Sequence, residues 1–212
     1  MHYHDPLGFP LTAAPRWPGD PWADRAAAVY DAVSALGFGT FGRLAEHVRA
    51  LPVARTTRPD DPMAVLHEGC GTGSAKHRLL ATVAQGGGHF EVMLTLGIYA
   101  MSEANSPGVG AVLEAAAQSS IPATRCYLTI DHQRFDFTGD ARGTDTPFMA
   151  LSAEYFLSPD ALAEREGPLH RQALTHWAEL HGLSEHAAWA LHLACSAARD
   201  RTADAPPAPA RR

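Results

Sequence analysis

A helix bounded by glycines constrains the fold of this chain most. It lies within the stretch EGCGTGSAKHRLLATVAQGGG, from Glu68 to Gly88. Thr72 or Ser74 can cap its N-terminus, and three successive glycines end it, so the pattern predicts a helix from Ser74 to Gln85. The rest of the fold has to provide partners for this helix, and the segments on its two sides differ in kind.

Helical patterns come before this stretch, and strand patterns come after it. Apolar residues recur at helical spacing between Ala23 and Gly37, and a second short helix is expected from Phe41 to Leu51, before Pro52. Two strand-like segments follow, the second of which turns back on itself, and two or three helices end the chain. This order predicts an α+β fold with helices packed on an antiparallel sheet. The expected strands cover His89 to Met101, Arg125 to Ile130 and Arg134 to Thr138.

One hydrophobic core is expected, because the chain has 212 residues, of which 46% are hydrophobic. We assign residues 23–200 to a single domain. Residues 1–22 are rich in proline, glycine and aromatic residues, and they predict an extended arm anchored by Trp17 and Trp22. Residues 201–212 have low complexity and predict a disordered tail.

Composition argues against several classes of partner. The net charge is −6 and the only basic run is Arg211-Arg212, so nucleic acid is not an expected partner. No window approaches the roughly 18 apolar residues that a membrane span needs. Three cysteines without CxxC spacing and the lack of a signal-like N-terminus favour a soluble cytoplasmic protein. The histidine spacings form no metal-binding pattern, so neither a metal nor another cofactor is expected.

Four segments resemble one known family. The stretch LPVARTTRPDDPMAVLHEGCGTGSAKHRLLATVA resembles the part of a bacterial transglutaminase-like family that reads LPYGR and then ExxGTCSSKHALL. LGIYAMSEANSPGVGAVL resembles its GIYxMNExNTPGVGxVL, and IPATRCYLTIDHQRFDFTG resembles its IPEAHCYL and RxDFT. AWALHLACSAA is similar to its last helix. The match is colinear from Leu51 to Ala198, and it implies a papain-like fold with a cysteine at a helix start and a histidine and an acid on adjacent strands.

The departures from that family remove two of its three catalytic residues. Gly73 stands where the family has its nucleophile, Arg125 stands where it has its base, and only the acid remains, as Asp136. Thiol catalysis needs a thiolate with an imidazole in reach, and an arginine with a pKa above about 12 cannot act as a base near neutral pH. A conventional protease, transglutaminase or acyl transferase mechanism is therefore not expected.

Strand alternation predicts what replaces the triad. Arg125 and Tyr127 share one face of the sheet with Asp136 and Thr138, and the apolar residues between them face the core. Arg125 and Asp136 should form a charge-assisted pair, directly or diagonally. The helix N-terminus at Gly73 and Ser74 should face this pair, and its N–H groups favour an anion. We expect a carboxylate or amide ligand at Gly73, Ser74, Arg125 and Thr138. An inert ion pair is the alternative.

Further residues fall on positions of the family motifs. Glu68 and His77 are candidate acids or bases, and the phenol of Tyr127 is a candidate donor to a developing negative charge. The structural alternative is that Lys76 and His77 tie the helix to neighbouring loops, while Glu68 and Glu103 bind loop backbone. Arg55 and Asn105 also match motif positions, without an assigned role.

Two classes of function remain open. The first is an enzyme without a thiol nucleophile that acts on a small amide, amino acid or acyl metabolite by cyclisation, rearrangement, elimination or amide formation. The second is a catalytically inactive homologue that binds a small ligand or a protein partner. Thiol chemistry by Cys70 is a minor third alternative, because Cys70 lies three residues before Gly73.

Overall fold

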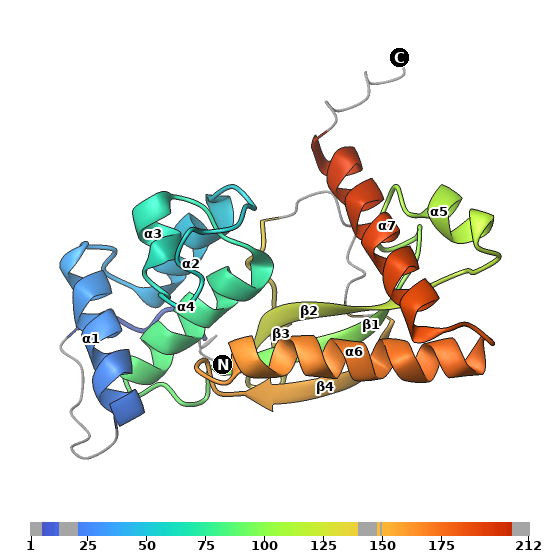
Figure 1. Ribbon diagram of the computed structural model, residues 1–212. Coiled ribbons are helices and arrows are strands. Elements are labelled where there is room, and N and C mark those ends of the chain that lie inside the picture. Colours follow the sequence, from blue (N-terminus) through green and yellow to red (C-terminus); the bar gives the residue numbers. More distant parts are fainter. Residues whose placement is uncertain (1–5, 13–20, 140–147, 149, 205–212) are drawn as a thin grey trace, which may run out of the picture. The chain divides into compact units, whose positions relative to one another are not determined.

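The computed structural model describes residues 6–12, 21–139, 148 and 150–204 (Figure 1). It contains both helices and a four-stranded sheet, as expected for an α+β fold. The elements are α1 (Pro21–Ala35), α2 (Phe41–Ala50), α3 (Ala64–Glu68), α4 (Gly73–Gly86), β1 (Met93–Met101), α5 (Gly110–Ala115), β2 (Ile121–Ile130), β3 (Gln133–Phe135), β4 (Leu151–Leu157), α6 (Leu162–Leu180) and α7 (Glu185–Asp204).

The sheet has the strand order β3-β2-β1-β4. Strands β2 and β3 form an antiparallel hairpin in which Leu128 pairs with Phe135 and Ile130 pairs with Gln133. The two residues of its turn, Asp131 and His132, have φ values of 48° and 64°, a backbone that suits the twist of a tight hairpin. The hairpin was expected, but β3 ends at Phe135 and not at Thr138.

Two compact units make up the chain. The first is drawn from Met1–Leu96, Arg125–Gly139 and Glu154–Arg165, and the second from Gly97–Thr124, Asp140–Ala153 and Glu166–Arg212. Strands β1, β2 and β4 contribute residues to both units, so neither unit is one uninterrupted stretch of chain. The single domain expected over residues 23–200 stays a prediction.

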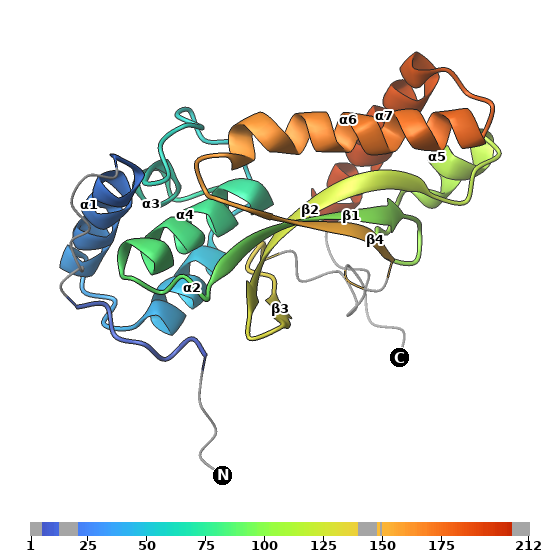
Figure 2. The same ribbon diagram turned by 90° about the horizontal axis from the view of Figure 1, so that it is seen from below.

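Helix α4 is the central helix of the first unit, and it packs against α1, α2 and α3 (Figure 2). Most of its residues after the first turn are buried. Its contact with α1 is close because Gly86 has no side chain, and a Cβ there would overlap the carbonyl group of Ala26. The sequence thus predicted both the helix and its glycine terminator.

The described part of the N-terminal arm, residues 6–12, is extended along the start of α2. Pro10 and Thr40 form an antiparallel bridge, and Phe9 stacks on Phe41 with 4.6 Å between the ring centroids. The expected boundary of the arm at residue 22 is wrong, because α1 begins at Pro21 and includes Trp22. Trp17 lies outside the described residues.

The second unit contains α5, the larger part of α6, and α7. Its core joins residues from the three elements β1, α5 and β2 to Leu174 on α6 and Cys195 on α7. Helix α7 continues to Asp204, so the tail expected to be disordered from Arg201 begins with helix, and residues 205–212 lie outside the described part of the chain. No described helix is long and apolar enough to cross a membrane.

Candidate functional site

Helix α4 begins with the cap that the sequence predicted. The Thr72 hydroxyl accepts a hydrogen bond from the Ala75 N–H at 3.2 Å, which satisfies one of the free donors of the first turn. Gly73 is the first helical residue, and Ser74 follows it in a half-buried position. The start of α4 is therefore determined by residues close in sequence and does not depend on a contact with the sheet.

Arg125 on β2 and Asp136 after β3 form the expected ion pair. The Arg125 Nε lies 2.5 Å from Asp136 Oδ2, and the two side chains are 22% and 15% exposed. The hairpin register makes them diagonal neighbours. Burial alone would raise the pKa of Asp136, but the Arg125 guanidinium and hydrogen bonds from Thr138 outweigh burial and lower it. Asp136 is therefore ionised at neutral pH.

Only one nitrogen of Arg125 is used in this pair. Its Nε donates to Asp136, and no described residue accepts a hydrogen bond from its two terminal nitrogens. A guanidinium carries five N–H donors in a planar fork, so the terminal nitrogens keep four donors for another partner. Asp136 holds the fork in place, and the partial exposure of Arg125 leaves it in contact with solvent.

His77 joins α4 to the chain after β3, as the structural alternative expected. Its Nε2 accepts the backbone N–H of Phe137 at 2.7 Å. A backbone N–H can only donate, so the proton of the neutral ring must lie on Nδ1, which donates to the Gly73 carbonyl at 2.8 Å. Burial lowers the pKa of His77 to about 4. The ring is neutral at pH 7, and neither nitrogen is free for the acid or base role that was considered.

Lys76 makes a second tie between α4 and the loops beside it. Its side chain is fully buried, and Nζ donates to the carbonyl oxygens of Leu51 at 2.5 Å and Thr138 at 2.7 Å. Burial lowers the pKa of Lys76, and the nearby Asp136 carboxylate acts against that decrease. Lys76 thus fastens both the end of α2 and the segment after β3 to the first turns of α4.

Thr138 occupies the space next to Gly73. A Cβ built on Gly73 would lie 2.9 Å from the Thr138 Oγ1 and 3.4 Å from its Cγ2. Contacts of a real Cβ essentially never fall below 3.0 Å. The position that holds the nucleophile in the resembled family is thus closed by a side chain from the neighbouring segment. The residues joined by these contacts are called the Arg125 cluster below. They are Gly73, Lys76, His77, Arg125, Asp136 and Thr138.

Tyr127 does not lie on an open polar face. The residue is fully buried, and its hydroxyl donates to Glu154 Oε1 on β4. Burial, followed by the Glu154 carboxylate, raises the pKa of Tyr127 well above its usual value. Arg134 donates to both oxygens of Glu154, at 2.8 and 2.6 Å. Thr129 on the same face is buried too, with its hydroxyl 2.8 Å from that of Thr95. The polar face that was expected to hold Arg125 and Tyr127 is therefore partly exposed at Arg125 but covered at Tyr127, so the expected role of the phenol as a donor in the ligand site is wrong.

Glu68 binds loop backbone, as the structural alternative expected. Its carboxylate accepts the Thr57 N–H and the Thr57 hydroxyl, both at 2.8 Å, and the backbone hydrogen bond is the main reason that its pKa is lowered. Glu103 does the same in the second unit, where it accepts the N–H groups of Gly108 and Gly110. The Asn105 amide accepts the Ser102 N–H and donates to the carbonyl oxygen of Ala100 near the end of β1.

The cysteines show no arrangement for thiol catalysis among the described residues. Cys70 is half-buried, lies close enough to Lys76 to interact with it electrostatically, and has no described hydrogen-bond partner. Cys126 and Cys195 are buried, and neither forms a disulfide. No group of three or more metal-binding side chains occurs within the described ranges.

Sequence reasoning missed Glu154, because it did not predict β4. The signal in the sequence LSAEYFL is an alternation of apolar residues with Ser152 and Glu154, which is typical of a strand with one covered face, and the structure shows the same alternation in burial over Leu151–Leu157. That alternation would have placed Glu154 on a strand. It would not have paired Glu154 with Tyr127 and Arg134, because the strand order is not readable from the pattern.

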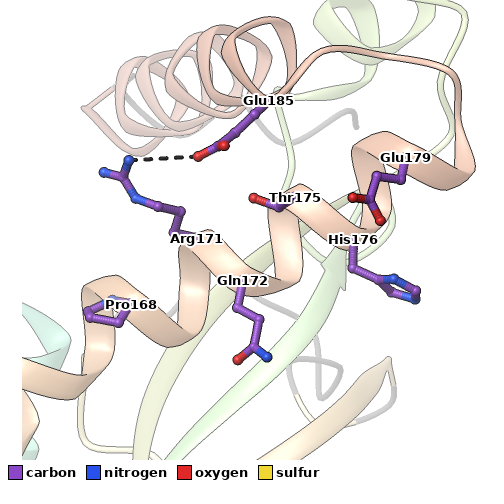
Figure 3. Close-up of a pocket in the computed structure, with 7 residues that line it drawn as sticks. All are labelled: Pro168, Arg171, Gln172, Thr175, His176, Glu179 and Glu185. Carbon is purple, nitrogen blue, oxygen red and sulfur yellow. Dashed lines mark ion pairs between the residues drawn. The ribbon is translucent and has the colours of Figure 1, made fainter.

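A shallow hollow lies elsewhere, along α6 and the start of α7 (Figure 3). Arg171 on α6 faces Glu185 at the start of α7 across it, with 3.7 Å between Nη1 and Oε1. None of the residues that sequence analysis selected lines this hollow. Its lining residues are Pro168, Arg171, Gln172, Thr175, His176, Glu179 and Glu185.

Comparison with known protein families, with curated proteins and with solved structures finds no match for this chain.

Proposed function

We propose that this chain is a transglutaminase-like protein without thiol catalysis, and that it binds a small carboxylate ligand through Arg125. The colinear motifs from Leu51 to Ala198 support the family assignment. The contact between the start of α4 and the Arg125–Asp136 hairpin supports it too, because the family pattern brings the same two segments together. Cytoplasmic location and the absence of a cofactor remain part of this proposal.

The proposed class of ligand rests on one observation, that only the Nε of the Arg125 guanidinium is bound to Asp136. Asp136 fixes one edge of the fork, while the terminal nitrogens remain available in a partly exposed position. A planar carboxylate matches such a fork with two parallel hydrogen bonds. Lys76 adds a second positive charge, and His77 is neutral, so the Arg125 cluster carries a net positive charge despite Asp136.

Binding is favoured over turnover because the candidate acids and bases are already engaged. Both nitrogens of His77 have partners, the phenol of Tyr127 is buried against Glu154, and Glu68 holds a loop. Thr138 closes the position beside Gly73. The positive charge of the Arg125 cluster remains, and it is sufficient for recognition of an anion.

A ligand screen by thermal unfolding tests this proposal. The probes are small monocarboxylates, dicarboxylates and amino acids, each paired with the neutral amide of the same skeleton. A ligand at 100 times its dissociation constant stabilises a protein by about 2.7 kcal/mol, which is a readily measured shift. We expect acids to stabilise the wild type and their matched amides to do so less.

Two arginine variants identify the site. Arg125→Gln should lose the shift, since it lacks both the charge and the fork. Arg134→Gln is the matched control, because Arg134 lies on the same hairpin but its fork is taken by Glu154, so this variant should keep the shift. The proposal is wrong if no acid stabilises the wild type, or if Arg125→Gln responds as the wild type does.

A further inference from the structure

Two histidine rings from different helices meet in the second unit. His170 on α6 and His192 on α7 lie 4.3 Å apart between their ring centroids, with 76° between the ring planes. The side chain of His170 is buried, and that of His192 is half-buried. The Trp189 indole stands beside both rings, at centroid distances of 5.6 and 5.7 Å. His170 and His192 are called the histidine pair below.

One main-chain carbonyl, that of Pro122 near the start of β2, faces the histidine pair. Its oxygen lies 3.2 Å from the Nε2 of His170. A carbonyl oxygen only accepts hydrogen bonds, so the proton of the neutral His170 ring lies on Nε2. The same carbonyl also acts on the His192 ring. Two imidazole rings therefore compete for one acceptor, and His170 holds it.

The hydrogen bonding of His192 is incomplete as a result. Its Nδ1 is buried and makes no hydrogen bond with any described residue. Its Nε2 is 3.4 Å from the Ser196 hydroxyl, which is a long contact for a hydrogen bond. Buried polar atoms in folded proteins nearly always have a partner. A protonated His192 ring would carry two N–H donors here, and only Ser196 is placed to accept from one of them.

The charges that act on the histidine pair also oppose its protonation. Among the described residues, Arg199 and a protonated His170 are the charged groups that act on His192, and both repel a positive charge. The carboxylate next to Arg199 in the chain, Asp200, is bound by Arg199 itself at 3.1 Å. Burial is the main reason that the pKa of each ring is lowered, to about 4 for His192. Both rings are neutral at pH 7.

Two charged side chains of α6 lie close to His170 in sequence and are bound to other groups. The Glu166 carboxylate, one helical turn before His170, accepts the Thr124 hydroxyl at 3.4 Å. The Arg171 guanidinium lies over the Trp189 ring, 5.7 Å from its centroid. Neither of them acts on the pKa of His170, which burial and the Pro122 carbonyl determine. A proton on the histidine pair therefore has no counter-ion within the described part of the second unit.

We propose that the histidine pair is an acid-sensitive contact, which holds α7 in place while both rings are neutral and releases it when His192 is protonated. A proton brings a charge into a site without a counter-ion, so the ring gains free energy by moving into water. The inner face of α7, with Leu191 and Cys195, would then leave the core of the second unit. This proposal concerns residues outside the Arg125 cluster and does not rest on the proposed function.

The direction and size of the effect follow from linkage. The His192 ring has a pKa of about 4 in the packed helix and 6.5 when it is unperturbed, as in a released helix. The contribution of the ring to packing is fully present above pH 6.5 and is lost as the pH falls toward 4. Between pH 7 and pH 5 the ratio of released to packed helix should rise by about 20-fold, because each pKa unit is a factor of ten in proton affinity.

Hydrogen exchange of the full chain, resolved by peptide at pH 7 and pH 5, measures this ratio. Comparison of protection factors removes the dependence of the intrinsic exchange rate on pH. Protection in the middle of α7 should fall by about 20-fold in the wild type, and at pH 5 it should be lower than in the middle of α4. Helix α4 is the internal reference because it is buried in the first unit and opens only when that unit unfolds.

Three variants separate the histidine from other effects of acid. His192→Phe keeps a ring in place but cannot be protonated, so protection of α7 should be nearly the same at pH 7 and pH 5. His186→Phe makes the same change at an exposed position of the same helix, and it should respond as the wild type does. Ser196→Asp places a carboxylate beside the His192 Nε2, and this counter-ion should prevent most of the loss at pH 5.

Each result supports or overturns the proposal. It is overturned if α7 of the wild type is equally protected at both pH values, or if His192→Phe loses protection as the wild type does. Equal protection of α7 and α4 at pH 5 would mean that α7 opens only with the whole chain, and would overturn local release. A full loss in Ser196→Asp would show that the lack of a counter-ion is not the cause. Loss in the wild type and His186→Phe, with retention in the other two variants, supports the proposal.

Discussion

Thr138 lies directly over Gly73, with its Oγ1 2.9 Å from the point where a Cβ of residue 73 would be. Gly73 starts α4, and Thr138 follows the acid that pairs with Arg125, so the contact joins the two segments that hold the catalytic groups in the resembled family. Thr138 can therefore occupy its position only because residue 73 has no side chain. A cysteine placed there would require Thr138 to move.

Gly73→Cys should destabilise the protein by about 1–3 kcal/mol, the usual cost of overpacking a filled site. Gly73→Cys with Thr138→Ala should recover most of that loss, because the second change removes the two atoms nearest to the new side chain. Urea unfolding measures both. Ser74→Cys, one residue later in the first turn, controls for adding a thiol. A Gly73→Cys variant as stable as the wild type would contradict the contact.

Lys76→Met should cost about 2–4 kcal/mol of unfolding free energy. The substitution removes the charged donor that the carbonyl oxygens of Leu51 and Thr138 share, and a hydrogen bond to a charged group contributes more than a neutral one. Arg49→Met is the matched control, because Arg49 is exposed and its ion pair with Glu46 spans 3.7 Å, so it should change stability by about 0.5 kcal/mol or less. Equal effects of the two variants would contradict the role of Lys76.

Stability should fall in acid because of His77. Its pKa is about 4 in the folded protein and 6.5 when unperturbed, so the unfolded chain binds more protons between these values. The free energy of unfolding therefore rises with pH across this window. The contribution of His77 to that free energy is fully present above pH 6.5 and is lost as the pH falls toward 4. The share of His77 is about 3 kcal/mol, from the 1.36 kcal/mol that each pKa unit represents.

Unfolding of His77→Gln at several pH values from 4 to 7.5 checks this share. The variant should be less stable at pH 7.5, since Gly73 and Phe137 lose a partner, and its stability should depend less on pH than that of the wild type. Curves for the two proteins that stay parallel over the whole range would exclude His77 as the source of the pH dependence.

Tyr127→Phe should leave ligand binding unchanged and lower stability by about 1 kcal/mol. The phenol donates to Glu154, which Arg134 also binds at two atoms, so the carboxylate keeps partners when the hydroxyl is removed. Calorimetric titration of the variant with the best acid from the screen measures the first effect, and urea unfolding measures the second. Loss of binding in Tyr127→Phe would contradict this prediction, because it would show that the phenol contacts the ligand.

The start of α4 and the Arg125–Asp136 pair were predictable because short-range rules govern them. A capping threonine, a glycine terminator and the alternation of two strands joined by a tight turn placed the cap and the ion pair correctly. These features depend on residues close in sequence or on one hairpin. Glu68 and Lys76 were selected by their positions in the family motifs, and the structural alternative for them, that they bind the backbone of neighbouring loops, is confirmed.

The burial of Tyr127 was not predictable from local pattern. Tyr127 contacts Glu154 of β4, and Thr129 on the same face contacts Thr95 of β1, so both contacts come from other parts of the chain. The early end of β3 has a similar cause, because His77 and Lys76 on α4 bind the backbone of residues 137 and 138 and draw it away from β2. Long-range packing decided what the strand pattern left open.

The most direct measurement of the central claim is calorimetric titration of the screened acid into the wild type and Arg125→Lys. Lysine keeps the positive charge but has no planar fork, so recognition by the two terminal nitrogens predicts at least about a tenfold loss of affinity. Equal affinity of the two proteins would contradict the account, because it would mean that charge alone attracts the ligand and that the fork held by Asp136 has no role in binding.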